Sequence, residues 1–210
     1  MRRLTETKRI DCEFVPQSGV RAIYSLSNLH ETELALHTLQ TTDPDMARLT
    51  RITRDENELA RLRVPGALGA VVTRVAARMW PYKFVARILE DLLTATDLPG
   101  GEFNLQTLTP AVSLHRCDSG GWDVHTPRGA IQADKLVLAT NAYTSHLLPA
   151  FTSLIVPVRG QMSALEPLPS VSGANRLKTS FGFAGEGIDD YLVQRPNESG
   201  GHLMFGGGRQ

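Results

Sequence analysis

The 210-residue sequence has only two cysteines, Cys12 and Cys117. Two thiols are too few for a disulfide framework or a zinc site, so we expect both to be reduced in an intracellular, cytoplasmic protein. No run of about 18 apolar residues occurs, so the sequence predicts no membrane-spanning helix. The basic start of the chain is not followed by an apolar stretch, so we expect no secretory signal.

An excess of one sign of charge is also lacking, because Lys and Arg together number 22 and Asp and Glu together number 22. A balanced charge gives no electrostatic reason to expect nucleic acid or an anionic membrane as a partner. Hydrophobic residues make up 41% of the sequence and charged residues 21%, which is ordinary for a soluble globular protein. The length allows one large domain or two small ones.

Motifs of several common sites are missing. The six histidines have no metal-ligand spacing, and no P-loop, nucleophile elbow or pair of carboxylates occurs, so we assign no metal site and no catalytic residue. A G-x-G-x-x-G turn, which brings the backbone close to the pyrophosphate of a dinucleotide, is absent too. Residues 66–69 have the wrong glycine spacing, and residues 185–187 lack the third glycine and the helix.

Residues 1–64 are polar and mostly helical in pattern. Asp43 and Pro44 are typical of a helix start, with Asp as the N-cap and Pro at the first helical position. Apolar residues follow at roughly helical spacing, namely Met46, Leu49, Ile52 and Leu59. These helices are too polar to form a core of their own, so we expect them to pack on another part of the protein.

Residues 65–79 contain a turn and then a β-branched stretch, and Trp80 and Pro81 open an amphipathic helix that residues 99–101 close. The apolar face of this helix consists of Phe84, Val85, Ile88, Leu89, Leu92 and Leu93. Trp80 and Tyr82 flank the helix start, and we expect both to pack in a core.

From residue 103 the pattern changes to short strands with turns between them. The expected strands are 103–108, 112–115, 122–126 and 130–133, with a hairpin turn at 118–121. His115 and His125 are expected to face each other across this hairpin. A continuous apolar run at Leu136–Ala139 then predicts a buried parallel strand, which would expose apolar surface and an unpaired edge if it lacked neighbours.

This strand ends in a polar turn formed by Thr140, Asn141, Ala142 and Tyr143. Ligands of α/β sheets lie beyond the carboxyl ends of the strands, so these residues are candidates to contact a cofactor. Further strands are expected at 161–165, 191–195 and 202–205, with a hairpin loop at 197–201.

Two segments carry a resemblance to a known family: the small-residue turn with its aromatic, Ala139–Tyr143, and the sequence Pro-Val-Arg-Gly-Gln at 157–161. They resemble the FAD-dependent D-amino-acid oxidase-like family, which includes glycine and sarcosine oxidases. The order of helix, strand, three-stranded meander and strand agrees with that family.

The resemblance implies an α/β fold, or α+β when the whole chain is considered, and it divides the chain into three parts. Residues 1–64 would be the helical part of a substrate or interdomain region. Residues 65–150 would be the C-terminal half of an FAD domain of the two-dinucleotide-binding type, with its β-meander. Residues 151–210 would be strands of an incomplete mixed or antiparallel substrate domain. The family's glycine fingerprint would precede this region and its C-terminal flavin segment would follow, so we expect a truncated, internal piece of the family fold.

The same resemblance implies FAD as the cofactor and suggests which residues contact it. Thr140, Asn141, Ala142 and Tyr143 would lie against the FAD, with Asn141 where members often have glycine; the alternative is an ordinary strand-to-loop turn. Ala111 or Val112 would contact the adenine part through the backbone. The family pattern has valine directly after the proline, whereas here Ala111 stands between Pro110 and Val112. The alternative for Ala111 and Val112 is a plain sheet position.

For the substrate, the resemblance suggests Arg159, Gln161 and Tyr191. Arg159 could pair with a carboxylate, or it could be satisfied by backbone carbonyls. Tyr191 could hydrogen-bond the substrate carboxylate, or it could be an interfacial tyrosine with its hydroxyl in water.

The implied function is FAD-dependent oxidation of a small-molecule amine or amino acid, by oxidative deamination or demethylation, in the parent enzyme. The rival is a non-catalytic α/β fragment that retains no flavin, which the missing glycine motif favours. A nicotinamide-dependent dehydrogenase fits the α/β pattern but not the meander or the Pro-x-Arg-Gly-Gln segment.

Overall fold

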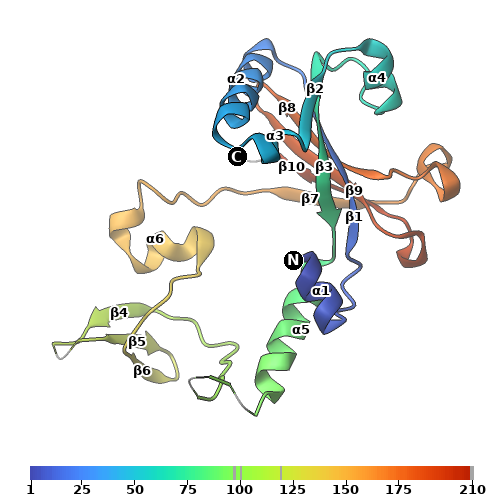
Figure 1. The fold of residues 1–210 in the computed structure, drawn as a ribbon. Coiled ribbons are helices and arrows are strands. Elements are labelled where there is room, and N and C mark those ends of the chain that lie inside the picture. The colour runs from blue at the N-terminus through green and yellow to red at the C-terminus, as the bar shows by residue number, and fades with distance from the viewer. Residues whose placement is uncertain (97, 100, 119, 209–210) are drawn as a thin grey trace. The chain divides into compact units, whose positions relative to one another are not determined.

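The computed structural model describes residues 1–96, 98–99, 101–118 and 120–208, and it divides the chain into two compact units (Figure 1). The larger unit consists of Met1–Leu89 and Gly160–Gln210, and the smaller unit of Glu90–Arg159. The expected boundaries after residues 64 and 150 differ from these, and the roles assigned to the three expected parts remain predictions. The predicted mixture of helices and strands is confirmed.

The larger unit is built on a seven-stranded mixed sheet in the order β2-β3-β1-β8-β9-β10-β7. Strands β1 and β8 run parallel, and the other described neighbours are antiparallel. The strands are β1 (Val15–Ile23), β2 (Thr50–Thr53), β3 (Gly69–Arg78), β7 (Gln161–Leu165), β8 (Thr179–Gly185), β9 (Ile188–Gln194) and β10 (Leu203–Gly207). The β-branched stretch in 65–79 forms β3, and the strands predicted at 161–165, 191–195 and 202–205 correspond to β7, β9 and β10.

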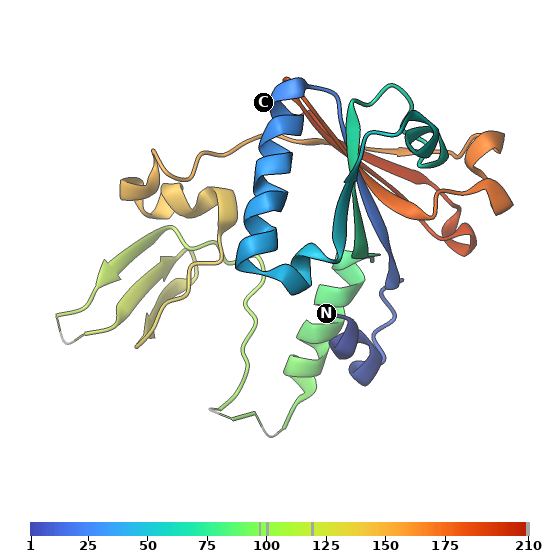
Figure 2. The same cartoon turned by 45° about the horizontal axis from the view of Figure 1, so that its top comes forward.

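Helices and short 3₁₀ turns connect these strands. The helices are α1 (Arg2–Lys8), α2 (Leu26–Thr42), α3 (Pro44–Ala47), α4 (Glu56–Arg61) and α5 (Pro81–Thr94), the last of which continues past Leu89. The 3₁₀ turns are η3 (Pro169–Val171), η4 (Gly173–Asn175) and η5 (Asn197–Ser199). Figure 2 shows α2 running beside the large sheet, with α3 at its C-terminal end leading back to β2. No helix of the described residues is long and apolar enough to cross a membrane.

The expectation that residues 1–64 are mostly helical is wrong for β1 and β2. The predicted helix start is confirmed, because the Asp43 carboxylate accepts the backbone N–H of Met46 at 3.1 Å. The helix ends at Ala47, however, and Ile52 lies in β2, where it pairs with β3. Pairing with a neighbouring strand thus overrides an apparent helical spacing, as tertiary context often does.

The main core lies on one face of the large sheet. Val20 and Ala22 of β1 point to this face, and Leu59 of α4 and Val64 of the following loop cover it. The buried members are Val20, Ala22, Leu59, Val64, Ala67, Ala70, Leu177 and Phe181. Adjacent strand residues alternate between faces, so Arg21 and its lateral neighbours point to the opposite face.

A second, smaller core fixes the start of α5. Phe84 of this helix packs with Ile10 and Cys12, and these three side chains are buried. The helix begins at Pro81 as predicted, since proline suits the first turn. Trp80, just before it, donates its backbone N–H to the carbonyl of Cys12 at 2.7 Å, which anchors the helix start to the segment that precedes β1.

The smaller unit contains the predicted antiparallel meander, formed by β4 (Ser113–Arg116), β5 (Trp122–Thr126) and β6 (Gly129–Ala133). The rings of His115 and His125 meet edge to face with centroids 4.8 Å apart, as expected. In the two turns predicted here, at 99–101 and 118–121, Gly100 and Ser119 lie outside the described residues. The unit also contains the short helices η1 (Asn141–Tyr143), α6 (Thr144–Leu147) and η2 (Pro149–Phe151).

The predicted strands at 103–108 and at Leu136–Ala139 are wrong: neither segment is a strand in the described structure. A strand forms only where a neighbour pairs with its N–H and C=O groups, and no described strand pairs with either segment. Val137, expected to be buried, is 87% exposed. Exposed apolar surface at this point agrees with the expectation for a strand without neighbours.

Candidate functional site

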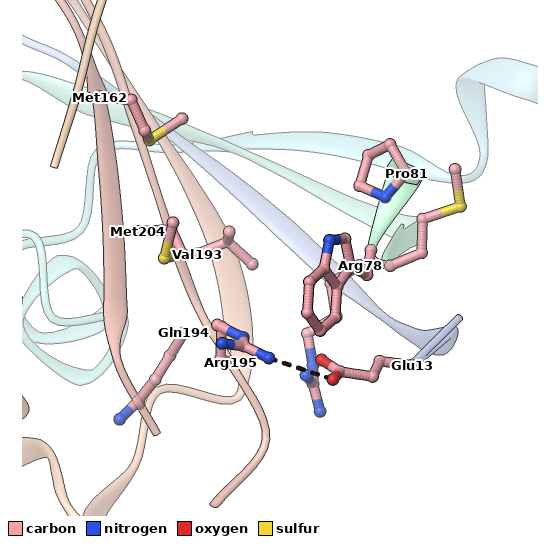
Figure 3. Close-up of a pocket in the computed structure, with 10 residues that line it drawn as sticks. Glu13, Arg78, Pro81, Met162, Val193, Gln194, Arg195 and Met204 are labelled. Atoms are coloured by element: carbon pink, nitrogen blue, oxygen red, sulfur yellow. Dashed lines mark hydrogen bonds and ion pairs between the residues drawn. The ribbon is translucent and has the colours of Figure 1, made fainter. Parts of the chain in front are cut away.

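An apolar cavity of about 390 Å³ lies in the larger unit (Figure 3). Met162 of β7, Val193 of β9 and Met204 of β10 form one wall, which Figure 3 shows opposite Arg78 and Pro81. Val193 pairs laterally with Met204, so both side chains point to the same face of the sheet. The full lining is Glu13, Arg78, Met79, Trp80, Pro81, Met162, Val193, Gln194, Arg195 and Met204.

Three thioethers and an indole dominate the lining of this cavity. Methionine is flexible and polarisable, so it adapts to ligands of different shape. Tryptophan offers a rigid apolar face. A concave apolar site with a few polar groups at its edge is the usual form of a small-molecule site. The cavity is therefore suited to the apolar part of an organic molecule.

An ion pair forms part of the polar edge of the cavity. Nη2 of Arg195 donates to Oε1 of Glu13 at 3.2 Å (Figure 3). The Ser199 hydroxyl donates to the same oxygen at 2.8 Å. The Arg195 and Glu13 side chains are only 30% and 14% exposed. The Arg195 guanidinium also lies over the Trp80 ring, 4.6 Å from its centroid, and Nζ of Lys83 lies 5.1 Å from that centroid. These contacts hold the edge in a defined geometry.

Gln194, next to Arg195, is 1% exposed and fixes the loops behind the cavity wall. Its Oε1 accepts the backbone N–H of Leu177 at 2.7 Å. Its Nε2 donates to the carbonyls of Val171 and Gly201, each at 2.8 Å. All the polar atoms of this buried amide are thus paired, as burial requires.

Arg78 supplies a second cation at the edge. Burial lowers the pKa of its guanidinium, and the nearby charge of Arg176 lowers it further, whereas Glu13 and Glu198 act in the opposite direction. Within the described residues the Arg78 guanidinium has no hydrogen bond and no ion pair of its own. An arginine stays protonated at neutral pH, so this edge offers uncommitted donors.

The residues predicted to contact the cofactor lie in the smaller unit. Asn141 has φ +46°, which confirms that Asn tolerates the unusual backbone angle at this point of the turn. The hydroxyls of Thr140 and Thr144 are 2.8 Å apart and fasten the turn, and Tyr143 is 75% exposed. Ala142 is half-buried.

Ala111 and Val112, also predicted to lie near the cofactor, precede β4. Ala111 is half-buried, and Val112 is 52% exposed and donates its backbone N–H to the carbonyl of His125 at 2.8 Å. The backbone of Val112 is thus used by the meander.

Of the residues predicted to bind substrate, Tyr191 lies beside the cavity wall. It is two residues before Val193 on the same face of β9 and pairs with Gly206, which in turn pairs with Met162. Glycine at position 206 makes room for this side chain, because a Cβ there would be 2.6 Å from the Tyr191 ring and would force the ring to move. Gln161 is exposed and precedes Met162, so it points to the other face. Arg159 is exposed and belongs to the smaller unit.

Sequence reasoning missed most of the cavity: Glu13, Arg78, Met79, Met162, Val193, Arg195 and Met204 were not assigned to a site. They come from separate segments that only the sheet brings together, so no local motif identifies them. Trp80 was expected in a core, whereas it is 38% exposed and lines the cavity. The core expectation is wrong for Tyr82, which is 76% exposed because it lies on the outer side of the helix start.

Comparison with known proteins gives one family. The family model described as FAD dependent oxidoreductase (DAO) matches residues 1–210. Comparison with curated proteins finds no match.

Several solved structures share the fold at low sequence identity. Glycine oxidase from Geobacillus kaustophilus is 18% identical with a TM-score of 0.67, over 97% of this chain and 50% of that one. Iminodiacetate oxidase from Chelativorans sp. BNC1 is 17% identical with a TM-score of 0.65, over 99% of this chain and 53% of that one. L-Amino acid deaminase from Proteus myxofaciens is 18% identical with a TM-score of 0.63, over 97% of this chain and 43% of that one. The chain thus spans about half the length of the solved structures that it matches.

Proposed function

The chain belongs to the family of FAD-dependent oxidoreductases, and on this premise we propose that it serves the FAD-dependent oxidation of a small amine or amino acid. The observation that supports this most is the apolar cavity with guanidinium groups at its edge. The matched enzymes are named for glycine, L-amino acids and iminodiacetate, which are small molecules that combine an amine with a carboxylate. A site with an apolar wall and a cationic edge can accommodate both parts of such a molecule.

FAD is the cofactor of this family, and some residues of this chain fit its flavin end. The turn at Asn141 takes a positive φ, and the exposed ring of Tyr143 offers a surface on which a planar ring could stack. No glycine-rich turn for the pyrophosphate occurs in the sequence. When bound, FAD supplies a hydride acceptor for the carbon that bears the nitrogen.

The proposed contribution of the chain itself is binding and orientation. Met162, Val193 and Met204 would receive the apolar part of the substrate and keep water from it. The Tyr191 hydroxyl, on the same face, would hydrogen-bond the substrate carboxylate. The substrate roles suggested for Arg159 and Gln161 remain predictions. Separate contacts to the apolar part and to the carboxylate would hold the substrate in one orientation. We also propose a cytoplasmic location, which two free thiols fit.

A second candidate is a non-catalytic fragment that retains no flavin. The exposed segment around Val137 supports it, because a parallel strand of an α/β sheet is covered on both faces and Val137 is 87% exposed. Retention of flavin separates the two candidates.

Binding in the cavity can be tested without FAD, because the chain has two tryptophans and the Trp122→Phe change leaves Trp80 as the only one. We expect L-leucine to change the Trp80 emission in a saturable way, and glycine to act far more weakly, because it has no apolar part. The variant Val193→Phe, which fills the cavity, should abolish the leucine signal. The matched control Val112→Phe changes an exposed valine in the smaller unit and should leave it intact. Equal responses in both variants would contradict the proposed binding site.

A further inference from the structure

A second concave site, a groove of about 160 Å³, lies where β1 begins, β3 ends and the chain enters β8. It is lined by Val15, Pro16, Gln17, Arg78, Arg176, Leu177 and Lys178. Three of these side chains are cations, and none is a carboxylate. We call this site the basic groove.

Several side-chain donors of the cations in the basic groove have no acceptor among the described residues. Arg176 uses Nη2 for the carbonyls of Arg195 and Gln194, at 2.8 and 3.1 Å, but its Nε is buried and unpaired. Within the described residues, neither the Arg78 side chain nor the Lys178 side chain has a hydrogen bond or ion pair. A buried donor without an acceptor is costly, so an acceptor that reached Nε of Arg176 would be stabilised there.

The nearest carboxylates compensate these charges only from outside the groove. Glu13 already accepts hydrogen bonds from Arg195 and Ser199, and Glu198 is exposed on η5. The charge of Arg176 also lowers the pKa of Arg78, so two like charges lie close enough to repel each other. An anion placed between them would replace repulsion by attraction and would satisfy the free donors.

We propose that the basic groove binds a small oxyanion, held by Arg78, Arg176 and Lys178. Planar guanidinium groups match the oxygens of a phosphate or a carboxylate, and the ammonium of Lys178 adds a flexible third cation. Because Arg78 lines the apolar cavity as well as the groove, the oxyanion has two possible sources. It is either a free anion, or the carboxylate of a molecule whose apolar part fills the cavity.

Isothermal titration of the whole chain with inorganic phosphate, at constant ionic strength set with sodium chloride, tests the site. We expect saturable binding at one site per chain. The variant Arg78→Met should bind phosphate at least about tenfold more weakly, since hydrogen bonds to charged groups are worth that much. Lys178→Met should weaken it about threefold, because an exposed pair contributes less.

The matched control is Arg48→Met, which removes one positive charge at an exposed position outside the groove and should not change the affinity. Lys178 is exposed, so its substitution is not expected to disturb folding, and a thermal melt of each variant checks this. Equal affinity in the wild type and in the Arg78→Met and Lys178→Met variants, or no saturable binding of phosphate or acetate, would overturn the proposal.

The two sources are distinguished by comparing acetate with 4-methylpentanoate. If the groove takes the carboxylate of the cavity's occupant, the longer acid binds more tightly than acetate, and Val193→Phe removes the difference. If it takes a free anion, the two acids bind alike and phosphate binds at least as well as either.

Discussion

The guanidinium of Arg195 lies 4.6 Å from the centroid of the Trp80 ring while it donates a hydrogen bond to Glu13 at 3.2 Å. This relationship joins three segments that are distant in sequence: the segment before β1, the start of α5 and the end of β9. A guanidinium over an indole face is attracted by the electrostatic field of the ring, and the attraction grows as water is excluded. We infer that this contact fixes the edge of the apolar cavity.

A double-mutant cycle measures the contact directly. We expect Arg195→Met and Trp80→Leu each to lower the free energy of unfolding, with a coupling energy of about 1 kcal/mol between them. Urea denaturation of the wild type, both single variants and the double variant gives this value. Strictly additive effects would mean that the contact contributes nothing to stability.

The Gln194→Leu variant should lose about 3 kcal/mol of unfolding free energy, because it leaves the backbone groups of Leu177, Val171 and Gly201 unpaired in a buried site. Gln40→Leu, at an exposed position of α2, is the matched control and should change stability little. The midpoints of urea denaturation compare the two. A loss of the same size in the control would show that the buried amide has no special role.

The two thiols should differ sharply in reactivity. Cys12 is completely buried, and burial raises the pKa of its thiol, so it lacks both access and thiolate character. Cys117 is half-buried and should react with a disulfide reagent under native conditions, although desolvation and the neighbouring Asp123 raise its pKa.

Titration of the native chain at pH 8 should therefore show one reactive thiol, and two after unfolding in urea. The Cys117→Ser variant should show none before unfolding. Rapid reaction of Cys12 in the native chain would contradict the observed packing of the small core around Phe84.

Acid should lower the folding stability of the chain in part by protonating Glu58. A hydrogen bond from Arg51 holds the pKa of this carboxyl below its ordinary value of 4.5. A lowered folded-state pKa gives stability that is present above the unfolded value and is lost as the pH falls through the folded value. Glu58→Gln should therefore reduce the fall in melting temperature between pH 6 and pH 3. An unchanged pH profile would show that the pair with Arg51 is too exposed to matter.

Local signals predicted much of the fold. Asp43 as an N-cap, Pro81 at a helix start and the turns of the meander act over a few residues, so the sequence alone identifies the elements around them. Strand β1 was missed because Pro16 and Gly19 are poor strand residues, and it forms only because β3 and β8 pair with it. Leu136–Ala139 has the strand pattern but no described neighbour to pair with.

The site was harder to predict than the fold, because its residues come together only through the pairing of strands that are distant in sequence. Tyr191 was assigned from a resemblance and lies beside the cavity wall, but Arg78, Arg195 and Glu13 become neighbours only through the order of the strands. The proposed roles of Thr140, Asn141, Ala142 and Tyr143 depend on a cofactor and remain predictions.

The central claim is that this chain serves an FAD-dependent oxidation, and its visible spectrum with FAD tests that claim most directly. The chain is incubated with FAD, desalted, and recorded before and after anaerobic addition of L-leucine. We predict retained flavin bands that are shifted by the protein and bleach with the amino acid. Asn141→Gly should keep the bands, and Asn141→Ile should lose them, because a β-branched residue does not tolerate φ +46°. A colourless chain after desalting would contradict the claim and favour the non-catalytic fragment.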